Sequence, residues 1–300
     1  MKRRAVTLPP PPPALSAPFR ELLHALLARG VRLRGERTET ARARRTALSQ
    51  SGTFVGHRPY TRGDDLRRLD WAAYARSGEF FLKQLEQEER RSVTLWLDLS
   101  PRLAAGSPPR RLAAVRLAAV LGGLALRRLD GLTVLAPGHS PPVATFAGAA
   151  DLDGLLRWLD SLPYSISAPD RGPELALQRS LPGRVHWLSD FARPKACERP
   201  LLALRRRGVK VTGWLPAIAD DRGPVARGAL RLVDPESGDE LMVAVDDALA
   251  AELERQLATL ARQQDRLFAQ AGCRLVRWPV PAADDLRLEA WSAMLTEAAR

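Results

Sequence analysis

Two aspartates stand directly after apolar runs, at positions where a carboxylate could bind a metal ion. Asp98 follows the run VTLWL, and Asp190 follows VHWLS. If both runs are parallel strands of one sheet, their carboxyl ends meet at one edge, where ligands bind in such folds. With the hydroxyls of Ser100 and Ser189 they form an all-oxygen set suited to Mg²⁺. Position alone equally favours a second interpretation, in which each aspartate caps the helix that follows.

A second cluster of charged and aromatic residues lies at 56–76, in the run GHRPYTRGDDLRRLDWAAYAR. Arginines there can form forked ion pairs with the neighbouring aspartates. Because one surface pair contributes at most about 1 kcal/mol, so many in one segment indicate a specific docked geometry. The segment is either a structural clamp for the N-terminal arm or an interaction surface. The residues that we single out are Arg58, Tyr60, Gly63, Asp64, Asp65, Arg67, Asp70, Trp71 and Arg76.

Common catalytic and nucleotide-binding motifs are missing from the sequence, which contains no GxxxxGK[ST], GxGxxG, HExxH or GxSxG. His186 lies inside an apolar run, which favours a buried, hydrogen-bonded imidazole over a catalytic base. Cys197 and Cys273 are too few for a disulfide framework or a four-ligand zinc site. We therefore expect a protein that is not an enzyme, with no cofactor or at most weak Mg²⁺ binding.

The elements that must position these residues follow from the alternation of apolar runs with amphipathic segments after residue 90. Such alternation predicts right-handed crossovers and a doubly wound, mostly parallel α/β sheet. Strands are predicted at 92–97, 132–136, 143–146 (an edge strand), 184–188, 209–215 and 273–278. Helices are predicted at 17–30, 108–129, 151–161, 173–181, 196–206, after residue 245 and from 283.

Two of these elements carry more detailed expectations. Segments 229–233 and 240–245 flank the turn DPESGD, which predicts a hairpin before a long helix. That helix has leucines on one stripe, at Leu249, Leu253, Leu257, Leu260 and Leu267. In helix 108–129 the stripe facing the sheet is Leu112, Val115, Ala119, Gly123 and Leu126. The arginines expected to face water are Arg110, Arg111, Arg116, Arg127 and Arg128.

Composition and charge place limits on the class of protein. At 300 residues and 45% hydrophobic, the chain can bury a core without disulfides. Much of its net charge of +12 lies in the first 50 residues, where Phe19 is the single aromatic residue. A nucleic-acid groove normally interleaves stacking aromatics, so we do not expect nucleic acid as the main partner. Five prolines precede any apolar run, which predicts a cytoplasmic protein with no transmembrane segment.

The run RPYTRGDDLRRLDWAAYAR, the acid-rich stretch 86–89 and VTLWLDLS closely resemble the bacterial domain of unknown function 58 family. The hairpin containing Asp234 and Glu236 also follows in family order, so the resemblance covers about residues 30–295. Members of the family are similar to von Willebrand factor A domains, and many are encoded beside a MoxR-type AAA+ ATPase. The resemblance thus implies a von Willebrand factor A type fold with an N-terminal arm and a C-terminal β-hairpin plus helix, and an AAA+ ATPase of the MoxR type as partner.

Composition and the resemblance together predict three parts of the chain. Residues 1–16 are expected to be a disordered, proline-rich basic tail. Residues 17–90 form an N-terminal helix and the GDD-motif segment, packed on the main domain. Residues 91–300 form the von Willebrand factor A-like α/β domain.

A-type domains hold a metal ion with Asp-x-Ser-x-Ser, a later threonine and an aspartate after a central strand. Asp98 and Ser100 match the first two positions and Asp190 corresponds to the last, but Arg102 replaces the second serine and Pro173 stands where the threonine is expected. A guanidinium about 5 Å from Mg²⁺ would repel it by about 7 kcal/mol at an effective dielectric constant of 20. The resemblance therefore implies a degenerate metal-ion site (MIDAS), in which we expect Arg102 to replace the ion by neutralising Asp98 or Asp190.

These features predict a non-enzymatic protein-interaction module, an adaptor or co-factor for a MoxR-type AAA+ ATPase in protein remodelling or complex assembly. Two other functions stay open. One is a metal-dependent hydrolase built on the strand-end carboxylates Asp98 and Asp190. The other is a nucleic-acid adaptor that binds through the arginine-rich arm, residues 1–45.

Overall fold

A computed structural model describes residues 14–29, 53–62, 64–66, 69–86, 92–104, 110–128, 130–163, 183–218, 227–280 and 286–298. Its contacts divide the chain into two units. Residues 32–90 form the smaller unit, and residues 1–31 and 91–298 form the larger one. The helix predicted at 173–181 and its Pro173 lie outside the described residues. Of the helices that the structure describes, none is both long and apolar enough to cross a membrane.

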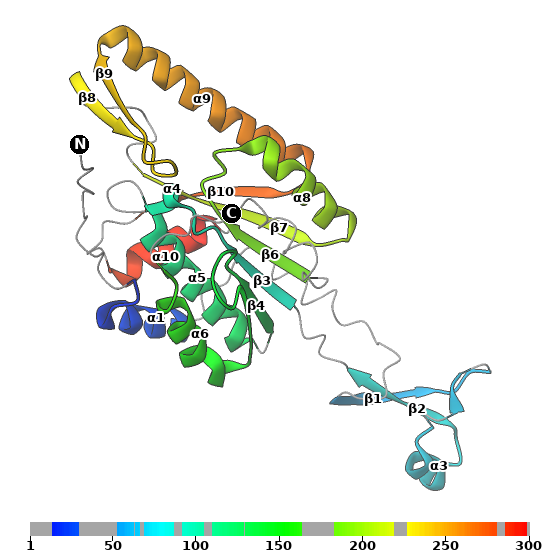
Figure 1. The fold of residues 1–300 in the computed structure, drawn as a ribbon. Coiled ribbons are helices and arrows are strands. Elements are labelled where there is room, and N and C mark those ends of the chain that lie inside the picture. Colours follow the sequence, from blue (N-terminus) through cyan, green and yellow to red (C-terminus); the bar gives the residue numbers. More distant parts are fainter. Residues whose placement is uncertain are drawn as a thin grey trace. The chain divides into compact units, whose positions relative to one another are not determined.

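The larger unit is built on a six-stranded sheet with the order β10-β7-β6-β3-β4-β5 (Figure 1). All neighbouring strands are parallel except β4 and β5, which pair antiparallel at one edge. This confirms the predicted mostly parallel α/β sheet with an edge strand near residue 145. The strands are β3 (Ser92–Leu97), β4 (Gly131–Leu135), β5 (Val143–Ala147), β6 (Gly183–Leu188), β7 (Lys210–Ala217) and β10 (Arg274–Pro279).

Helices cover both faces of this sheet (Figure 1). On one face, α5 packs on β3 and β4, α6 on β5, and α10 on β10, with α1 lying over α5 and α10. On the other face α8 packs on β7 and α9 on β10. The helices are α1 (Ala17–Arg29), α4 (Pro101–Ala104), α5 (Arg110–Arg127), α6 (Leu152–Asp160) after the 3₁₀ turn η2 (Ala149–Asp151), α8 (Pro194–Arg206), α9 (Asp247–Gln270) and α10 (Leu288–Ala298).

Helix α5 is buried on all sides, because α1 covers the surface that the sheet leaves open. The prediction that its arginines face water is therefore wrong for Arg111 and Arg116, which are 6% and 5% exposed. Arg116 Nε donates to the Ala14 carbonyl at 3.0 Å, and its guanidinium lies 5.3 Å from the centre of the Phe19 ring. Arg111 Nη2 donates to the Leu162 carbonyl at 3.0 Å. The long side chains hold neighbouring segments through backbone carbonyls.

Two adjacent glycines let α5 pack closely on both sides. A Cβ on Gly122 would lie 3.4 Å from Leu95 and 3.2 Å from Leu132, two residues of the sheet. A Cβ on Gly123 would instead lie 3.0 Å from Leu27 of α1. The prediction that Gly123 faces the sheet is thus wrong, since the presence of α1 over α5 turns that position toward a helix.

The first and last helices of the larger unit pack against each other. In Figure 1, α1 (blue) and α10 (red) lie side by side, and an aromatic contact joins them directly. Phe19 and Trp291 are both fully buried, with ring centroids 5.7 Å apart in an edge-to-face arrangement. Residues near the two ends of the chain therefore share one part of the core.

The core beneath α8 and α9 is rich in aromatic rings. Trp96 of β3 and Trp187 of β6 stack at 4.0 Å between centroids, and Phe191 meets Phe268 of α9 edge-to-face at 5.0 Å. Gly213 of β7 lies directly under Phe268, because a Cβ there would come within 2.5 Å of two ring carbons. A residue without a side chain is required where this ring rests on the sheet.

His186 of β6 is buried and hydrogen-bonded, as predicted. Its Nδ1 accepts a hydrogen bond from Trp214 Nε1 at 3.0 Å, and the residue is 5% exposed. Burial lowers the pKa of His186 to about 3, and the positive charge of Arg184 acts in the same direction. The imidazole is therefore neutral in the folded protein at ordinary pH.

This buried imidazole makes stability depend on pH. The unfolded chain protonates His186 near its ordinary pKa of 6.5 and the folded protein only near 3, so stability falls as the pH drops below 6.5. At up to about 1.4 kcal/mol per pH unit, the loss reaches about 2 kcal/mol at pH 5. The variant His186→Gln keeps an acceptor for Trp214. Its free energy of unfolding, measured with urea, should fall between pH 7 and pH 5 by about 2 kcal/mol less than that of the wild type. Equal losses in both proteins would contradict the prediction.

A β-hairpin and a long helix connect β7 to β10. Strand β8 (Gly228–Val233) pairs antiparallel with β9 (Glu240–Val245), which confirms the predicted hairpin, and α9 follows after its N-cap Asp246. The leucine stripe of α9 is only partly covered. Leu267 is buried, whereas four leucines are half-buried: Leu249, Leu253, Leu257 and Leu260.

The smaller unit contains a two-stranded antiparallel sheet and a short helix. Strand β1 (Thr53–Pro59) pairs with β2 (Phe81–Glu86), and α3 (Trp71–Ser77) lies in the connection between them. The GDD-motif segment belongs to this unit.

Candidate functional site

Asp98 and Asp190 lie next to each other at the carboxyl edge of the sheet. Strands β3 and β6 are parallel neighbours with Leu97 opposite Leu188, so the residues that follow them emerge side by side. Asp98 Oδ2 accepts from Ser189 Oγ at 2.7 Å, and its Oδ1 accepts from the Ser100 amide at 2.8 Å. The juxtaposition predicted from the parallel topology is thus present.

The helix-cap interpretation does not describe Asp190. Helix α8 begins at Pro194, its N-cap is Arg193, and no side chain caps it. Asp190 Oδ1 instead accepts from the Ala192 amide at 3.1 Å, within its own loop.

Burial raises the pKa of Asp98, and repulsion by Asp190 acts in the same direction. Hydrogen bonds from Ser189 and Ser100 favour the charged form and oppose this shift. The edge therefore holds two close carboxylates that need a positive charge beside them.

Arg102 supplies that positive charge. Its Nε donates to Asp190 Oδ2 at 2.9 Å, so the guanidinium lies on one of the two carboxylates that we expected it to neutralise. Burial acts to lower the pKa of Arg102, but Asp190 and Glu236 outweigh it and the pKa is raised. Arg102 is charged at any ordinary pH.

The same arginine also holds the tip of the β8–β9 hairpin, which reaches the neighbourhood of α4 (Figure 1). Arg102 Nη1 donates to Glu236 Oε1, and Arg193 Nη2 donates to Glu236 Oε2 at 2.8 Å. Glu236 was known from the sequence only as a hairpin residue. Its role escaped prediction because it lies 134 positions from Arg102, and no pattern of spacing connects the two.

The hairpin turn fixes the position of Glu236. Asp234 Oδ1 accepts from the amide of Glu236 at 2.7 Å and from that of Ser237 at 3.4 Å, and Gly238 closes the turn with a φ of +74°. The Glu236 amide is the main cause of a lowered pKa for Asp234. An aspartate at this position stabilises the turn by accepting hydrogen bonds from backbone amides.

A buried glutamine holds the Asp190 loop from the opposite side. Gln264 of α9 is 5% exposed, and its Nε2 donates to the carbonyls of Asp190 and Phe191, both at 3.1 Å. Phe191 has a φ of +49°, which a non-glycine residue adopts only when its surroundings require it. The sequence offered no signal for Gln264, since a glutamine in a charged helix normally faces water.

These donors do not fit a Mg²⁺ ion. Among the described residues, no three His, Cys, Asp or Glu side chains are close enough together to hold a metal. One oxygen of Asp190 already accepts from a guanidinium, and one of Asp98 accepts from the Ser189 hydroxyl. Ser100 Oγ is buried and has no hydrogen-bond partner among the residues that the structure describes. The position at which a metal-binding threonine was expected, Pro173, lies outside the described residues.

In the smaller unit, Asp64 is the centre of the GDD-motif segment. Arg58 forks onto it with distances of 2.8 and 2.6 Å, and the amide and hydroxyl of Thr61 donate at 2.8 and 2.7 Å. The Arg58 hydrogen bond is the largest cause of a strongly lowered pKa for Asp64. Gly63 and Arg67 lie outside the described residues.

Asp70 organises the start of α3. Its Oδ1 accepts from the amides of Ala72 and Ala73 at 3.0 and 3.1 Å, and its Oδ2 lies 2.8 Å from His57 Nε2. Asp70 is therefore an N-cap that also joins α3 to β1. Among the residues predicted in this segment, Arg58, Asp64 and Asp70 thus make contacts within the smaller unit itself.

An aromatic surface lies on the same unit. Tyr74 stacks on Phe80 at 4.5 Å between centroids, Tyr60 meets Phe80 edge-on at 6.3 Å, and Trp71 meets Tyr74 edge-on at 6.3 Å. Trp71 is 64% exposed. Asp65 and Arg76 are also exposed. The segment thus combines a hydrogen-bonded frame with exposed rings.

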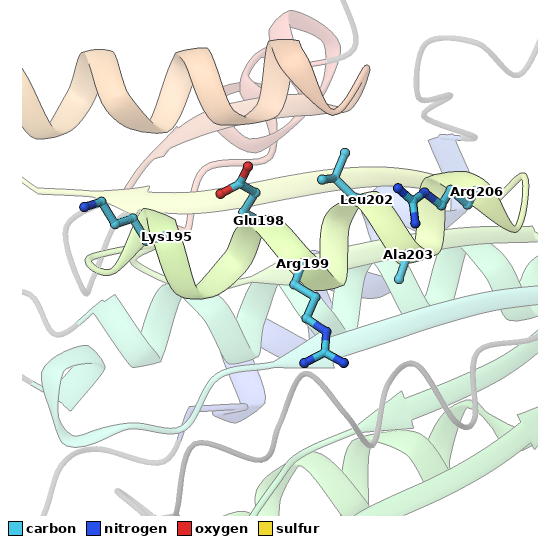
Figure 2. A pocket seen from close by; sticks show the side chains of 6 residues that line it. All are labelled: Lys195, Glu198, Arg199, Leu202, Ala203 and Arg206. Carbon is cyan, nitrogen blue, oxygen red and sulfur yellow. The ribbon is translucent and has the colours of Figure 1, made fainter.

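An open hollow of about 340 Å³ runs along the outer side of α8 (Figure 2). In Figure 2, Glu198 and Arg199 point to opposite sides of the helix. The hollow contains none of the residues that the sequence singled out. Half of its lining residues are basic, and the six are Lys195, Glu198, Arg199, Leu202, Ala203 and Arg206.

Two solved structures share limited similarity with the chain. One is the conserved hypothetical protein BatB from Bacteroides thetaiotaomicron, with 15% identity over 70% of this chain and 98% of that one, at a TM-score of 0.35. The other is an aerotolerance-related membrane protein from Bacteroides fragilis NCTC 9343 with multiple mutations to serines, with 15% identity over 69% and 98%, at a TM-score of 0.37. Comparison with curated proteins finds no match.

The comparison with protein families agrees with the sequence resemblance. Residues 56–265 match the model described as "Protein of unknown function DUF58". The match begins in the GDD-motif segment, includes both strand-end aspartates and Glu236, and ends inside α9. Because it spans more than two thirds of the sequence, the chain belongs to the DUF58 family.

Proposed function

We propose that this DUF58 protein is a non-enzymatic interaction module of von Willebrand factor A type, an adaptor for an AAA+ ATPase of the MoxR type. The observation that carries the proposal is the bridge formed by Arg102. It joins Asp190, in the loop after β6, to Glu236 at the hairpin tip. In this proposal Arg102 replaces the metal ion of an A-type domain, and the carboxyl edge is the binding face.

The arrangement of charges supports recognition at this edge. The oxygens of Asp98 and Asp190 accept hydrogen bonds from neighbouring residues, so these carboxylates are held in fixed positions. The groups that reach solvent are Arg193 and Glu236, whose side chains are 61% and 31% exposed. Charged groups held at the rim of a surface select a partner by complementary charge and speed its encounter.

Affinity capture from the native host lysate, with and without ATP and Mg²⁺, tests the partner. Mass spectrometry should identify an AAA+ ATPase whose recovery changes with nucleotide. Recovery of nucleic acid, or of no ATPase while the bait is folded, would overturn the proposal.

A pair of arginine variants then tests the face. We expect Arg193→Glu to lose most of the captured ATPase, because it reverses a rim charge at the carboxyl edge. Arg206→Glu makes the same change on α8 and should retain the ATPase. Equal recovery with both variants would place the interface elsewhere on the protein.

Trp71→Ala separates the two interpretations of the GDD-motif segment. Because Trp71 is 64% exposed, its truncation should change the free energy of unfolding by less than about 1 kcal/mol. If the aromatic surface contacts the ATPase, recovery falls while the melting temperature is preserved. Unchanged recovery would assign the segment a structural role.

A further inference from the structure

Glu236 occupies a site built from two arginines of different segments. Arg102 belongs to α4 and Arg193 precedes α8, and each donates to a different oxygen of the Glu236 carboxylate. Two guanidinium groups that converge on one carboxylate form a charge-assisted recognition site of the kind that binds acidic groups in partners.

The site does not depend on Glu236 for its shape. Arg102 uses Nε to bind Asp190, which is 8% exposed, and a separate nitrogen, Nη1, to bind Glu236. The buried contact fixes the guanidinium, so its outer edge stays in position if the hairpin tip moves away. A second carboxylate could then take the same place.

The hairpin that carries Glu236 is covered by few other residues. Val245 at its base is buried, but the side chains near the tip are 47–68% exposed: Leu232, Val233, Leu241 and Met242. Ion pairs that are partly open to solvent each contribute little to stability. The tip is therefore attached by contacts that an incoming carboxylate of similar chemistry can replace.

We propose that Arg102 and Arg193 form a carboxylate-binding site for an acidic side chain of a protein partner, and that Glu236 is a tethered competitor which occupies this site in the free protein. The inference rests on the proposed function, because it names the partner chemistry recognised at the same edge. The two guanidinium groups favour an acidic partner by complementary charge. A tethered competitor reduces the apparent affinity by the fraction of time that it fills the site.

The test uses a fluorescein-labelled hexaglutamate peptide and fluorescence anisotropy. Glu236→Gln should bind it about fivefold more tightly than the wild type, the factor expected if the tethered ion pairs favour closure by about 1 kcal/mol. Glu254→Gln removes the same charge from an exposed position of α9 and controls for net charge. Equal affinities for the two variants would overturn the proposal.

Two arginine variants, both made in the Glu236→Gln background so that the competitor is absent, test the other half of the site. Arg193→Gln should weaken binding of the hexaglutamate peptide about fivefold, and Arg206→Gln on α8 should not weaken it. Because Arg193 is 61% exposed, its replacement leaves the fold intact. Equal weakening by both variants would show that the peptide responds only to net charge, which contradicts a defined site.

Hydrogen exchange distinguishes a competitor from a direct contact. If the peptide displaces Glu236, amides of residues 234–239 should exchange faster when it binds to the wild type. Slower exchange would make the tip part of the bound surface and would overturn the competitor role. If wild type and Glu236→Gln capture the ATPase equally and the variant does not bind the peptide more tightly, this inference alone is rejected. If the protein captures no ATPase but the peptide results are as expected, the proposed function alone is rejected.

Discussion

Replacing Arg102 by serine should lower the free energy of unfolding by about 2–3 kcal/mol without Mg²⁺, and Mg²⁺ should return part of that loss. The substitution leaves Asp190 without its cation, beside Asp98 at an edge that excludes most water. Removal of one partner from a fully buried ion pair costs about 3–5 kcal/mol. Because the Arg102 side chain is 24% exposed, we expect a smaller cost.

The gain from Mg²⁺ follows from the same geometry. Serine at position 102 removes the repelling charge and adds a hydroxyl beside two carboxylates, which are donors suited to Mg²⁺. If the variant binds Mg²⁺ with a Kd of about 1 mM, then 10 mM Mg²⁺ stabilises it by about 1.4 kcal/mol. Urea unfolding with 10 mM MgCl₂ and with EDTA measures both effects.

Arg193→Ser is the matched control, since it makes the same chemical change at the same edge. Arg193 is 61% exposed and contacts Glu236 rather than Asp190, so we expect a loss below about 1 kcal/mol and no response to Mg²⁺. Tight Mg²⁺ binding by the unmodified protein would show that Arg102 does not replace the ion.

Gly213→Val should destabilise the protein by about 3 kcal/mol, at the upper end of the cost of overpacking a core. Its Cβ would lie 2.5 Å from Cε1 and Cζ of Phe268 and 3.1 Å from Cζ of Phe191. Both rings are 1% exposed, so neither can retreat without displacing other side chains. The preference of valine for strands is worth less than this clash.

A double-mutant cycle identifies the cause of that loss. Phe268→Leu shortens the side chain over position 213 and should recover part of the stability lost in Gly213→Val, although it is destabilising by itself. Urea unfolding of the four proteins gives the coupling free energy. If the two losses simply add, contact with Phe268 does not explain the effect of valine.

The sequence predicts local structure well where apolar runs are continuous. Strand 92–97 has the predicted bounds because a parallel strand buried on both faces is apolar along its whole length. The meeting of Asp98 and Asp190 follows in turn, since parallel topology brings strand ends to one edge. The contact between Arg102 and Asp190 was also anticipated, because an arginine stands where the family resemblance expects a metal ligand.

Contacts that depend on how distant elements pack could not be predicted. Arg116 has the pattern of an exposed helix residue, and only the presence of α1 over α5 buries it. Glu236 contacts Arg102 and Arg193, and Gln264 contacts the Asp190 loop, from a hairpin and a helix that follow later in the chain. The periodicity of the sequence predicts the helix or hairpin that carries each residue. The contact itself depends on where that element packs in the folded protein.

The packing of α1 against α10 affects how the protein is made. Phe19 leaves the ribosome well before its ring partner Trp291, which follows 272 residues later in the sequence. At 5–20 residues per second, roughly 15–50 s of synthesis separate the two. During that time the apolar side chains of α1 lack this part of their final surroundings, so they stay open to other contacts until α10 has been translated.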